Sequence, residues 1–348
     1  MHRLPSCSPR PLLPFTGRKH PDAARANDEA TAWIVQHGLI TDAATDAFAG
    51  IAFGHLAARG EPEASYEDLL LLAQWLALAF VLDDQHDHLI RHDQLSAWQS
   101  VEDAITRTLD HATPRQPHRN PLTRAFADLY GRIRGRLEPT AHRRFTAHFR
   151  NIMESLNEEA RNRAPNSVPT ITDYILLRRH SSQIPAILDL SEAALNVEVA
   201  PEIRASPIFQ ELYWSAIDVI SWTNDIFSFP KEQSCGDTNN LPVLLCAQHR
   251  CRPEEAIRMT EQRILERLED FDSALQRLPR TMNALDFYDP LARSAALQMA
   301  YNLQDWMIGG DVWQRQECTR YHDERWNSGG EGAYNRPTLL TERSQGTS

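Results

Sequence analysis

The feature that most constrains the fold is the segment 69–82, a run of fourteen residues in which Gln74 is the one polar side chain. A run of this length is too short to span a bilayer, which takes about 20 apolar residues in a helix. A helix that is apolar on every side is typical of the centre of a folded protein. We therefore predict that 69–82 forms a buried helix around which other segments pack.

Helical periodicity continues along most of the chain. The segments 257–278 and 291–308 carry apolar residues at spacings of three and four, the pattern of an amphipathic helix. The sequence shows no convincing alternation of apolar and polar residues of the kind that strands require. We predict an all-α fold built as a single α-helical bundle.

Composition divides the chain into one central domain and two ends. The length of 348 residues would allow two domains, but no change in composition marks a linker between them. The first residues are rich in proline, and the last are polar and contain Gly329-Gly330. We predict a loosely attached N-terminal segment over 1–22, a helical domain over 23–325 and a flexible C-terminal tail over 326–348.

Charge and cysteine usage exclude several classes of protein. A net charge of −11 without a basic stripe argues against nucleic acid and against a stable association with anionic membranes. The first residues lack the apolar core of a secretory signal. The five cysteines are irregularly spaced, which is typical of a reduced chain. These features predict a cytoplasmic protein.

Three aspartates come directly after the central apolar run. If the helix continues, Asp83 and Asp87 lie on one face about 6 Å apart along its axis, with Asp84 beside them. Crowded carboxylates raise one another's pKa, and a hard divalent cation bound through oxygen removes this repulsion. The alternative is a solvated helix end. We expect the nearby histidines to face solvent and not to bind zinc; these are His86, His88 and His92.

A second group of oxygen ligands lies far down the chain. Asn224, Ser228 and Glu232 are spaced by four residues and project from one face of a helix. An amide oxygen, a hydroxyl and a carboxylate on one stripe suit a hard cation. Pro230 lies inside the stripe and is expected to kink or end the helix. The alternative is a polar stripe on a surface helix.

Together the two groups resemble the motifs of the class I terpene synthases, especially the single-domain enzymes of bacteria and fungi. That family carries a DDxxD motif, here the segment 83–87, and an N-D-x-x-S-x-x-x-E motif, here the segment 224–232. Arg178, 46 residues before Asn224, lies where the family has a diphosphate-sensing arginine. Arg320-Tyr321 matches the Arg-Tyr pair that ends the family's catalytic domain. These features agree in order and approximate spacing.

The resemblance implies a catalytic domain with a central active-site cavity and a carbon–oxygen lyase activity on a prenyl diphosphate. It implies three Mg²⁺ ions, for which Mn²⁺ can substitute. The implied metal ligands form two opposite walls: Asp83, Asp84 and Asp87 on one, and Asn224, Ser228 and Glu232 on the other. The implied diphosphate-binding residues are Arg178, Lys231, Arg320 and Tyr321. The implied trigger of ionisation is Arg178 with Ser181 or Ser182.

Carbocation chemistry calls for an inert, aromatic cavity, because ring faces stabilise cations. Phe80 lies one helical turn before Asp83, while Trp306 and Trp313 lie about four and two turns before Arg320. We predict that these three residues line the substrate cavity. The alternative for each of them is ordinary core packing.

The leading hypothesis is a Mg²⁺-dependent terpene cyclase that ionises a linear prenyl diphosphate and cyclises the cation. Farnesyl diphosphate is the favoured substrate because it is the commonest in this family, with geranyl and geranylgeranyl diphosphate as alternatives. A chain-elongating prenyltransferase would carry a second aspartate-rich motif, whereas Asn224, Ser228 and Glu232 occupy that place here. A third hypothesis is a non-catalytic helical binding protein. The resemblance also allows a homodimer.

Overall fold

The computed structural model describes residues 17–110, 120–163, 168–286, 289–328, 336 and 339–340. Every regular element in these ranges is helical, which confirms the all-α prediction. The main helices are α1 (Ala23–Gln36), α2 (Thr45–Ala49), α3 (Phe53–Gly60), α4 (Tyr66–Arg91), α5 (Leu95–Asp110), α6 (Pro121–Arg136), α7 (Pro139–Asn162), α8 (Ile171–Ser181), α9 (Ile184–Ala194), α10 (Pro201–Arg204), α11 (Pro207–Cys235), α12 (Leu241–His249), α13 (Pro253–Ala284), α14 (Pro290–Val312) and α15 (Glu324–Asn327).

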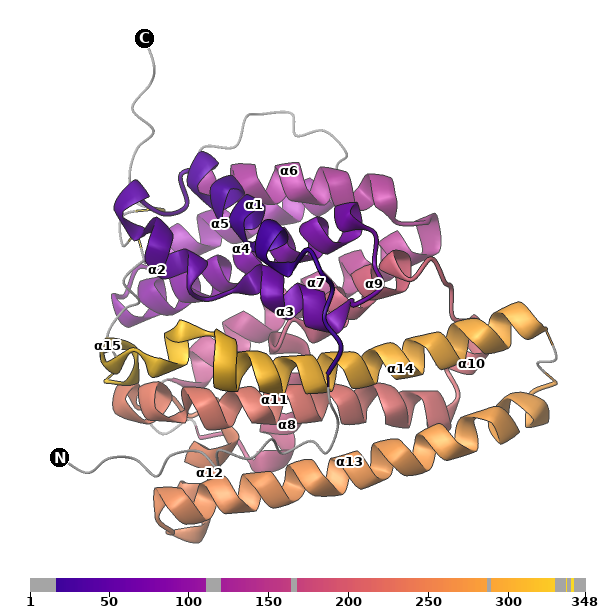
Figure 1. Cartoon of the computed structure of the whole chain (residues 1–348). Helices are drawn as coiled ribbons and strands as arrows, with labels where there is room; N and C mark the ends of the chain where they lie inside the picture. The colour runs from indigo at the N-terminus through magenta and orange to yellow at the C-terminus, as the bar shows by residue number, and fades with distance from the viewer. Residues whose placement is uncertain are drawn as a thin grey trace.

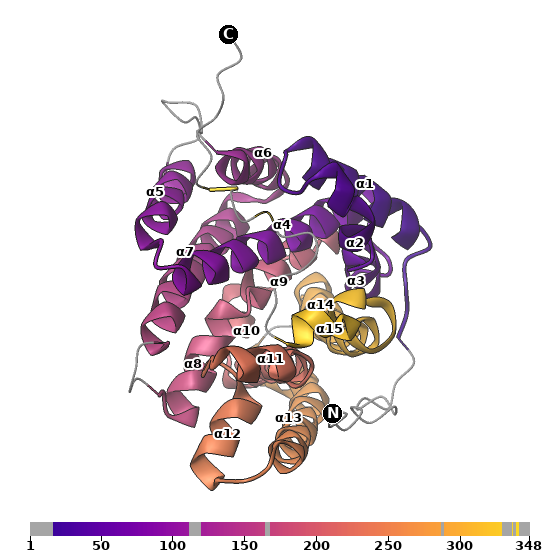
Figure 2. The same ribbon diagram turned by 90° about the vertical axis from the view of Figure 1, so that its left-hand side faces the viewer.

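The long helices run alongside one another in a bundle. Figure 1 shows α11 between α13 and α14, and α11 packs against both. The amino-terminal helices α1 and α3 pack against α4, and α3 also packs against α14. Figure 2 looks onto the end of the bundle at which α15 lies. In this way α4 and α11, which carry the two predicted motifs, belong to the same bundle.

Helix α4 begins at a serine cap and continues through the aspartate motif. The Ser65 hydroxyl accepts a hydrogen bond from the Asp68 backbone N–H at 3.2 Å, which satisfies one of the free donors of the first turn. The helix ends only at Arg91, so Asp83 and Asp87 lie one turn apart on the same face. Among the described residues, no helix is both long and apolar enough to cross a membrane.

Helix α11 does not end at Pro230. It starts after the cap Ser206, with Pro207 in its first turn, and runs to Cys235. It ends where Gly236 adopts a left-handed conformation with φ 69°, which costs glycine little. The expectation that Pro230 would end the helix is therefore wrong, and Glu232 continues the same helix as Asn224 and Ser228.

An aromatic cluster packs α4 against α6 and α7. Trp75 is 1 % exposed, and its ring centroid lies 5.1 Å from that of Phe145 and 5.4 Å from that of Phe149. Phe126 of α6 completes the cluster. Edge-on aromatic packing of this kind adds to the stabilisation from buried area. The cluster anchors the first half of α4, so that its second half carries the acidic residues at a defined place.

At both ends, described residues outside the predicted limits of the helical domain are packed or bonded to the rest of the chain. Near the N-terminus, Lys19 forms an ion pair of 2.7 Å with Glu317, and the His20 N–H bonds to the Ala58 carbonyl at 2.8 Å. Near the C-terminus, Trp326 and Leu339 are buried. The predicted limits at 22 and 325 therefore separate residues that pack together. Residues 1–16 and most of 329–348 lie outside the described part of the chain.

The expected exposure of the histidines beside the aspartates is wrong for two of the three. His86 is 1 % exposed and His88 is 6 % exposed, whereas His92 is exposed. The His86 ring packs edge-on against Trp98 of α5 with a centroid distance of 4.6 Å. Burial lowers the pKa of His86 to about 4, so it is neutral near pH 7. The packing of α5 against α4 covers this face, and the sequence of α4 alone does not show that.

Candidate active site

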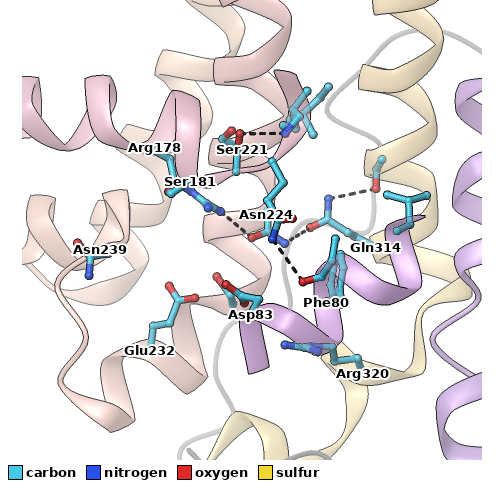
Figure 3. A pocket seen from close by; sticks show the side chains of 18 of the residues that line it. Phe80, Asp83, Arg178, Ser181, Ser221, Asn224, Glu232, Asn239, Gln314 and Arg320 are labelled. Carbon is cyan, nitrogen blue, oxygen red and sulfur yellow. Dashed lines mark hydrogen bonds between the residues drawn. The ribbon is translucent and has the colours of Figure 1, made fainter. Parts of the chain in front are cut away.

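A cavity opens between the two predicted motifs, and nearly all the predicted site residues line it. From the acidic side of α4 come Phe80, Asp83 and Asp87, and from α11 come Asn224, Ser228, Lys231 and Glu232. The remaining predicted residues that line the cavity are Arg178, Ser181, Ser182, Trp306, Trp313, Arg320 and Tyr321. Asp84 is the one predicted site residue that is not part of the lining. Figure 3 shows Asp83, Asn224 and Glu232 gathered around the same space.

The α4 wall holds two carboxylates in different electrostatic states. Arg163 lies 2.5 Å from Asp87 Oδ1, and Lys231 Nζ lies 3.0 Å from Asp87 Oδ2. Although burial opposes ionisation of Asp87, these two cations hold its pKa well below the usual value. Burial raises the pKa of Asp83 to about 6, and the neighbouring Asp87 and Asp84 carboxylates contribute to this rise. Asp83 is therefore the carboxyl of this wall whose ionisation the fold opposes, although Lys231 and Arg320 offset part of that cost.

Asp84 points to a different partner. Its two carboxylate oxygens accept hydrogen bonds from Arg320 Nη1 and Nη2, both at 2.7 Å, in a bidentate pair. The Arg320 guanidinium also lies over the rings of Trp326 and Phe80, at 3.6 Å and 5.2 Å from their centroids. Asp84 thus fixes the place of Arg320 at the cavity, and its position does not support the expected role as a metal ligand.

The α11 wall begins with a network around Asn224. Arg178 Nη2 donates to Asn224 Oδ1 at 2.9 Å (Figure 3). Asn224 Nδ2 donates to the Tyr321 hydroxyl at 2.7 Å. Arg178 Nε also donates to Asp225 Oδ1 at 3.1 Å. Asp225 accepts further bonds from the Tyr174 hydroxyl and from the Leu241 N–H. Asp225, the second residue of the motif, therefore anchors Arg178 behind the wall.

Glu232 closes the polar stripe of α11. Its Oε2 accepts a hydrogen bond from Asn240 Nδ2 at 2.7 Å, and the same amide lies 3.5 Å from Ser228 Oγ. Burial raises the pKa of Glu232 to about 8, and the neighbouring Asp237 and Asp225 add to this effect. A carboxyl in this environment gains from a cation placed beside it, because the cation removes the cost of its ionisation.

The residues present fit a hard divalent cation that is shared with a bound anion. Within the described ranges, no three side chains of His, Cys, Asp or Glu converge on one metal position. Magnesium is usually bound through one or two carboxylates together with substrate phosphate oxygens, so such a cage is not required. Asp83 and Glu232 are the two carboxyls with raised pKa values on the opposite walls, which is the donor chemistry such a site needs.

A break between α8 and α9 places polar groups in the lining of the cavity. Helix α8 ends at Ser181, and α9 starts at Ile184. Between them Gln183 has φ 64°, an unusual conformation for a residue with a side chain. Its amide donates to the Ala79 carbonyl of α4 at 3.3 Å, which ties the break to the residue next to Phe80. The predicted Ser181 and Ser182 lie at this break.

Aromatic and aliphatic side chains form the apolar part of the lining. The Phe80 ring centroid lies 6.0 Å from that of Trp313, and both rings line the cavity together with Trp306. The aliphatic part of the lining includes Leu56, Leu76, Ile184, Ile187 and Ile220. The three aromatic side chains predicted from the sequence therefore share one pocket instead of three separate parts of the core.

Sequence reasoning missed two charged residues of the cavity on α7 and just after it. Glu159 and Arg163 both line the cavity, and burial raises the pKa of Glu159 to about 8. The signal was present in the sequence. The buried stripe of α7 includes Phe149, Ile152 and Leu156, and Glu159 and Arg163 continue this stripe at helical spacing. Charged residues on the core-facing stripe of a helix point to a polar site.

Two polar walls, four cationic side chains and an aromatic interior are the arrangement expected of a terpene synthase. The family model "Terpene synthase family 2, C-terminal metal binding" matches residues 74–270, more than half of the chain. The chain belongs to this family, whose members are carbon–oxygen lyases that act on phosphates. Family membership implies a prenyl diphosphate substrate and a bound metal.

Individual relatives are similar over most of their length. A (+)-T-muurolol synthase of Roseiflexus castenholzii, described as cyclising (2E,6E)-farnesyl diphosphate, is 31 % identical over 90 % of this chain and 93 % of its own. The epi-isozizaene synthase of Streptomyces coelicolor is 28 % identical over 90 % of this chain and 88 % of its own. The crystal structure of a germacradien-4-ol synthase from Streptomyces citricolor superposes with a TM-score of 0.75 and 27 % identity, covering 87 % of this chain and 97 % of the other.

Proposed function

We propose that this terpene synthase is a Mg²⁺-dependent sesquiterpene cyclase that ionises farnesyl diphosphate and cyclises the resulting cation. The observation that carries the proposal is the pair of oxygen-rich walls, Asp83 with Asp87 and Asn224 with Ser228 and Glu232, which line one cavity. The choice of farnesyl diphosphate is supported by the T-muurolol synthase relative, which is described as cyclising that substrate.

The cationic side chains of the cavity would bind the diphosphate. Arg178, Lys231 and Arg320 line the cavity, and each is held there by a buried carboxylate of α4 or α11. The Tyr321 hydroxyl, already engaged with Asn224, would add a hydrogen-bond donor. Fixed donors of this kind stabilise the charge that develops on the leaving diphosphate without having to reorganise during the reaction.

The metal ions would be held by Asp83 and Asp87 on one wall and by Asn224, Ser228 and Glu232 on the other. When bound, Mg²⁺ neutralises phosphate charge and makes diphosphate a better leaving group. In the structure, Arg178 Nη2 donates a hydrogen bond to Asn224 Oδ1 at 2.9 Å. For Asn224 Oδ1 to bind a metal ion, Arg178 must give up this hydrogen bond and form one to the diphosphate instead. Binding of the substrate would in this way be coupled to assembly of the metal site.

After ionisation, the cavity would fold the allylic cation and keep water away. Phe80, Trp306 and Trp313 present aromatic groups to this space, and a cation over a desolvated ring gains about 2 kcal/mol. The polar break at Ser181 and Ser182 follows Arg178, at the end of α8 and directly before Gln183 with its positive φ. We propose that this break supplies the dipoles that favour departure of the diphosphate.

Turnover with defined substrates tests the proposal. The purified protein would be incubated with geranyl, farnesyl and geranylgeranyl diphosphate and Mg²⁺, and volatile products identified by mass spectrometry. We expect cyclic C15 products from farnesyl diphosphate and loss of turnover with EDTA, restored by excess Mg²⁺. Activity that EDTA leaves unchanged would contradict the metal requirement, and cyclic products from one of the other substrates alone would correct the chain length.

Replacing Phe80 by alanine is expected to change which products form more than how fast diphosphate is released. The Phe80 ring packs against Phe53 at a centroid distance of 4.8 Å and against Trp313 at 6.0 Å, and it lines the cavity. Its removal enlarges the space beside the cation but leaves the polar walls in place. We expect the ratio of products to change about tenfold, which corresponds to about 1.4 kcal/mol. Chromatography of the products beside a diphosphate assay measures both, and an unchanged product profile would assign Phe80 to the core alone.

A further inference from the structure

The Trp306 indole is held by hydrogen bonds to residues that lie outside the cavity lining. Its Nε1–H lies 3.0 Å from Glu61 Oε1 and 2.9 Å from Ser191 Oγ. Glu61 and Ser191 are both completely buried, and neither lines the cavity. The N–H edge of this cavity-lining ring is therefore fixed by two acceptors from the end of α3 and from α9.

Asn302 completes the network one turn before Trp306 on α14. Its amide nitrogen donates to Glu61 Oε1 at 2.9 Å and to the Gly60 carbonyl at 2.9 Å. One carboxylate oxygen of Glu61 thus accepts hydrogen bonds from two side chains of the same face of α14. The end of α3 and the middle of α14 are joined at the place where Trp306 meets the cavity.

Close backbone packing restricts the ring further. A Cβ atom added at Gly60 would lie 2.3 Å from the indole Cε2 of Trp306, so the ring lies directly on the backbone of α3. A Cβ atom added at Gly309 would lie 2.7 Å from the Cβ of Arg59, so both helices use glycine for this approach. Contact with the backbone on one side and hydrogen bonds at the N–H edge together allow the indole little rotation.

An acid at position 61 is costly for the fold. Burial raises the pKa of Glu61 to about 7, and among the described residues its Oε2 has no hydrogen-bond partner. A buried polar atom without a partner destabilises a protein, and an apolar side chain of similar size would avoid this cost. Features that break a local rule of stability in this way are concentrated at functional sites.

We propose that Glu61 is a positioning residue, which holds the Trp306 indole by its N–H and so sets the ring orientation that decides which cyclic product forms. The proposal rests on the proposed cyclase function. Competing folds of one carbocation differ by small free energies, since a tenfold change in product ratio corresponds to about 1.4 kcal/mol. The orientation of one ring at the cavity is therefore enough to change the product ratio.

The test compares Glu61→Leu, which removes one of the two acceptors of the Trp306 N–H, with Glu61→Gln, which keeps an acceptor at position 61. We expect Glu61→Leu to change the ratio of major to minor products at least threefold, while diphosphate release changes less than that. Glu61→Gln is expected to keep the parent ratio. Leu129→Ala, at a fully buried position of α6 that does not line the cavity, controls for lost stability and is expected to leave the ratio unchanged.

A double-mutant cycle tests whether Glu61 acts on the product ratio through the Trp306 indole N–H. Trp306→Phe removes the indole N–H, so adding Glu61→Leu to it is expected to change the product ratio no further. Additive effects of the two substitutions, or a parent ratio in folded Glu61→Leu, would overturn the proposal. Ser191→Ala, a smaller change at the other acceptor, is made in parallel in case Glu61→Leu does not fold. It is expected to shift the product ratio too. In that case, a parent ratio in Ser191→Ala would overturn the proposal.

A spectroscopic readout separates this proposal from the proposed function. In ¹⁵N-labelled protein, the indole N–H resonance of Trp306, assigned by its loss in Trp306→Phe, is expected to shift in Glu61→Leu and to stay near its parent position in Glu61→Gln. An unshifted resonance in Glu61→Leu would show that Glu61 does not hold the ring. If the parent protein turns over no prenyl diphosphate, the proposed function fails, and the resonance still decides whether Glu61 holds Trp306.

Discussion

Replacing Asn224 or Glu232 by alanine is expected to lower turnover of the prenyl diphosphate about 10²–10³-fold, the usual effect of losing one group that stabilises developing charge. Both side chains project from α11 into the cavity, and Glu232 is a carboxyl whose pKa burial has raised to about 8. The overall fold should survive, because each change shortens a polar side chain on the cavity wall. Diphosphate release measures turnover, and circular dichroism measures helical content.

Glu269→Ala supplies the matched control for Glu232→Ala. Glu269 lies on the exposed side of α13 and does not line the cavity. Its replacement should leave turnover within a factor of about two, since surface substitutions are usually close to neutral. Full activity in both Asn224→Ala and Glu232→Ala would refute the assignment of the α11 wall to metal binding.

Two neighbouring aspartates are expected to respond to the same substitution in opposite ways. Asp83→Asn should stabilise the protein without metal while reducing turnover, because it removes a buried charge that Asp87 and Asp84 repel. Asp84→Asn should destabilise the protein by ~3 kcal/mol, because it leaves the Arg320 guanidinium without its bidentate partner. Urea denaturation without Mg²⁺ measures both free energies of unfolding.

The effect of Asp83→Asn should depend on pH in a definite direction. Folding raises the pKa of Asp83 from 3.8 to about 6. Between these two pH values Asp83 ionises in the unfolded chain but stays mostly protonated in the folded protein. The parent therefore loses stability relative to Asp83→Asn as the pH rises from about 4 to 6, and the difference stays constant above this range. Its full size is on the order of 3 kcal/mol, since each pKa unit corresponds to about 1.4 kcal/mol.

Other stabilities of the Asp83→Asn and Asp84→Asn variants would change the roles assigned to the two aspartates. Equal loss of stability in both variants would mean that Asp83 is also paired within the fold. If Asp84→Asn left stability unchanged but lowered the affinity for Mg²⁺, measured by the metal concentration for half-maximal turnover, Asp84 would belong with the metal ligands after all. The bidentate pair of Asp84 with Arg320 supports a structural role for Asp84, and therefore a loss of stability in Asp84→Asn.

Much of this architecture can be predicted from local pattern. The buried helix through 69–82 and the helices over 257–278 and 291–308 follow from apolar periodicity, because a helix repeats every 3.6 residues wherever it occurs. The two polar stripes are local in the same sense. Asp83 and Asp87, and likewise Asn224 and Glu232, share a helix face by spacing alone, provided that the helix continues.

The amino-acid pattern thus determines which side chains share a face of one helix, but contacts between helices are decided by packing. Asp84 meets Arg320 across 236 positions of sequence, and the Glu61 carboxylate meets Trp306 across 245. The burial of His86 depends on the way α5 covers α4. Such pairs depend on how whole helices settle against one another, and no spacing within a helix encodes that arrangement.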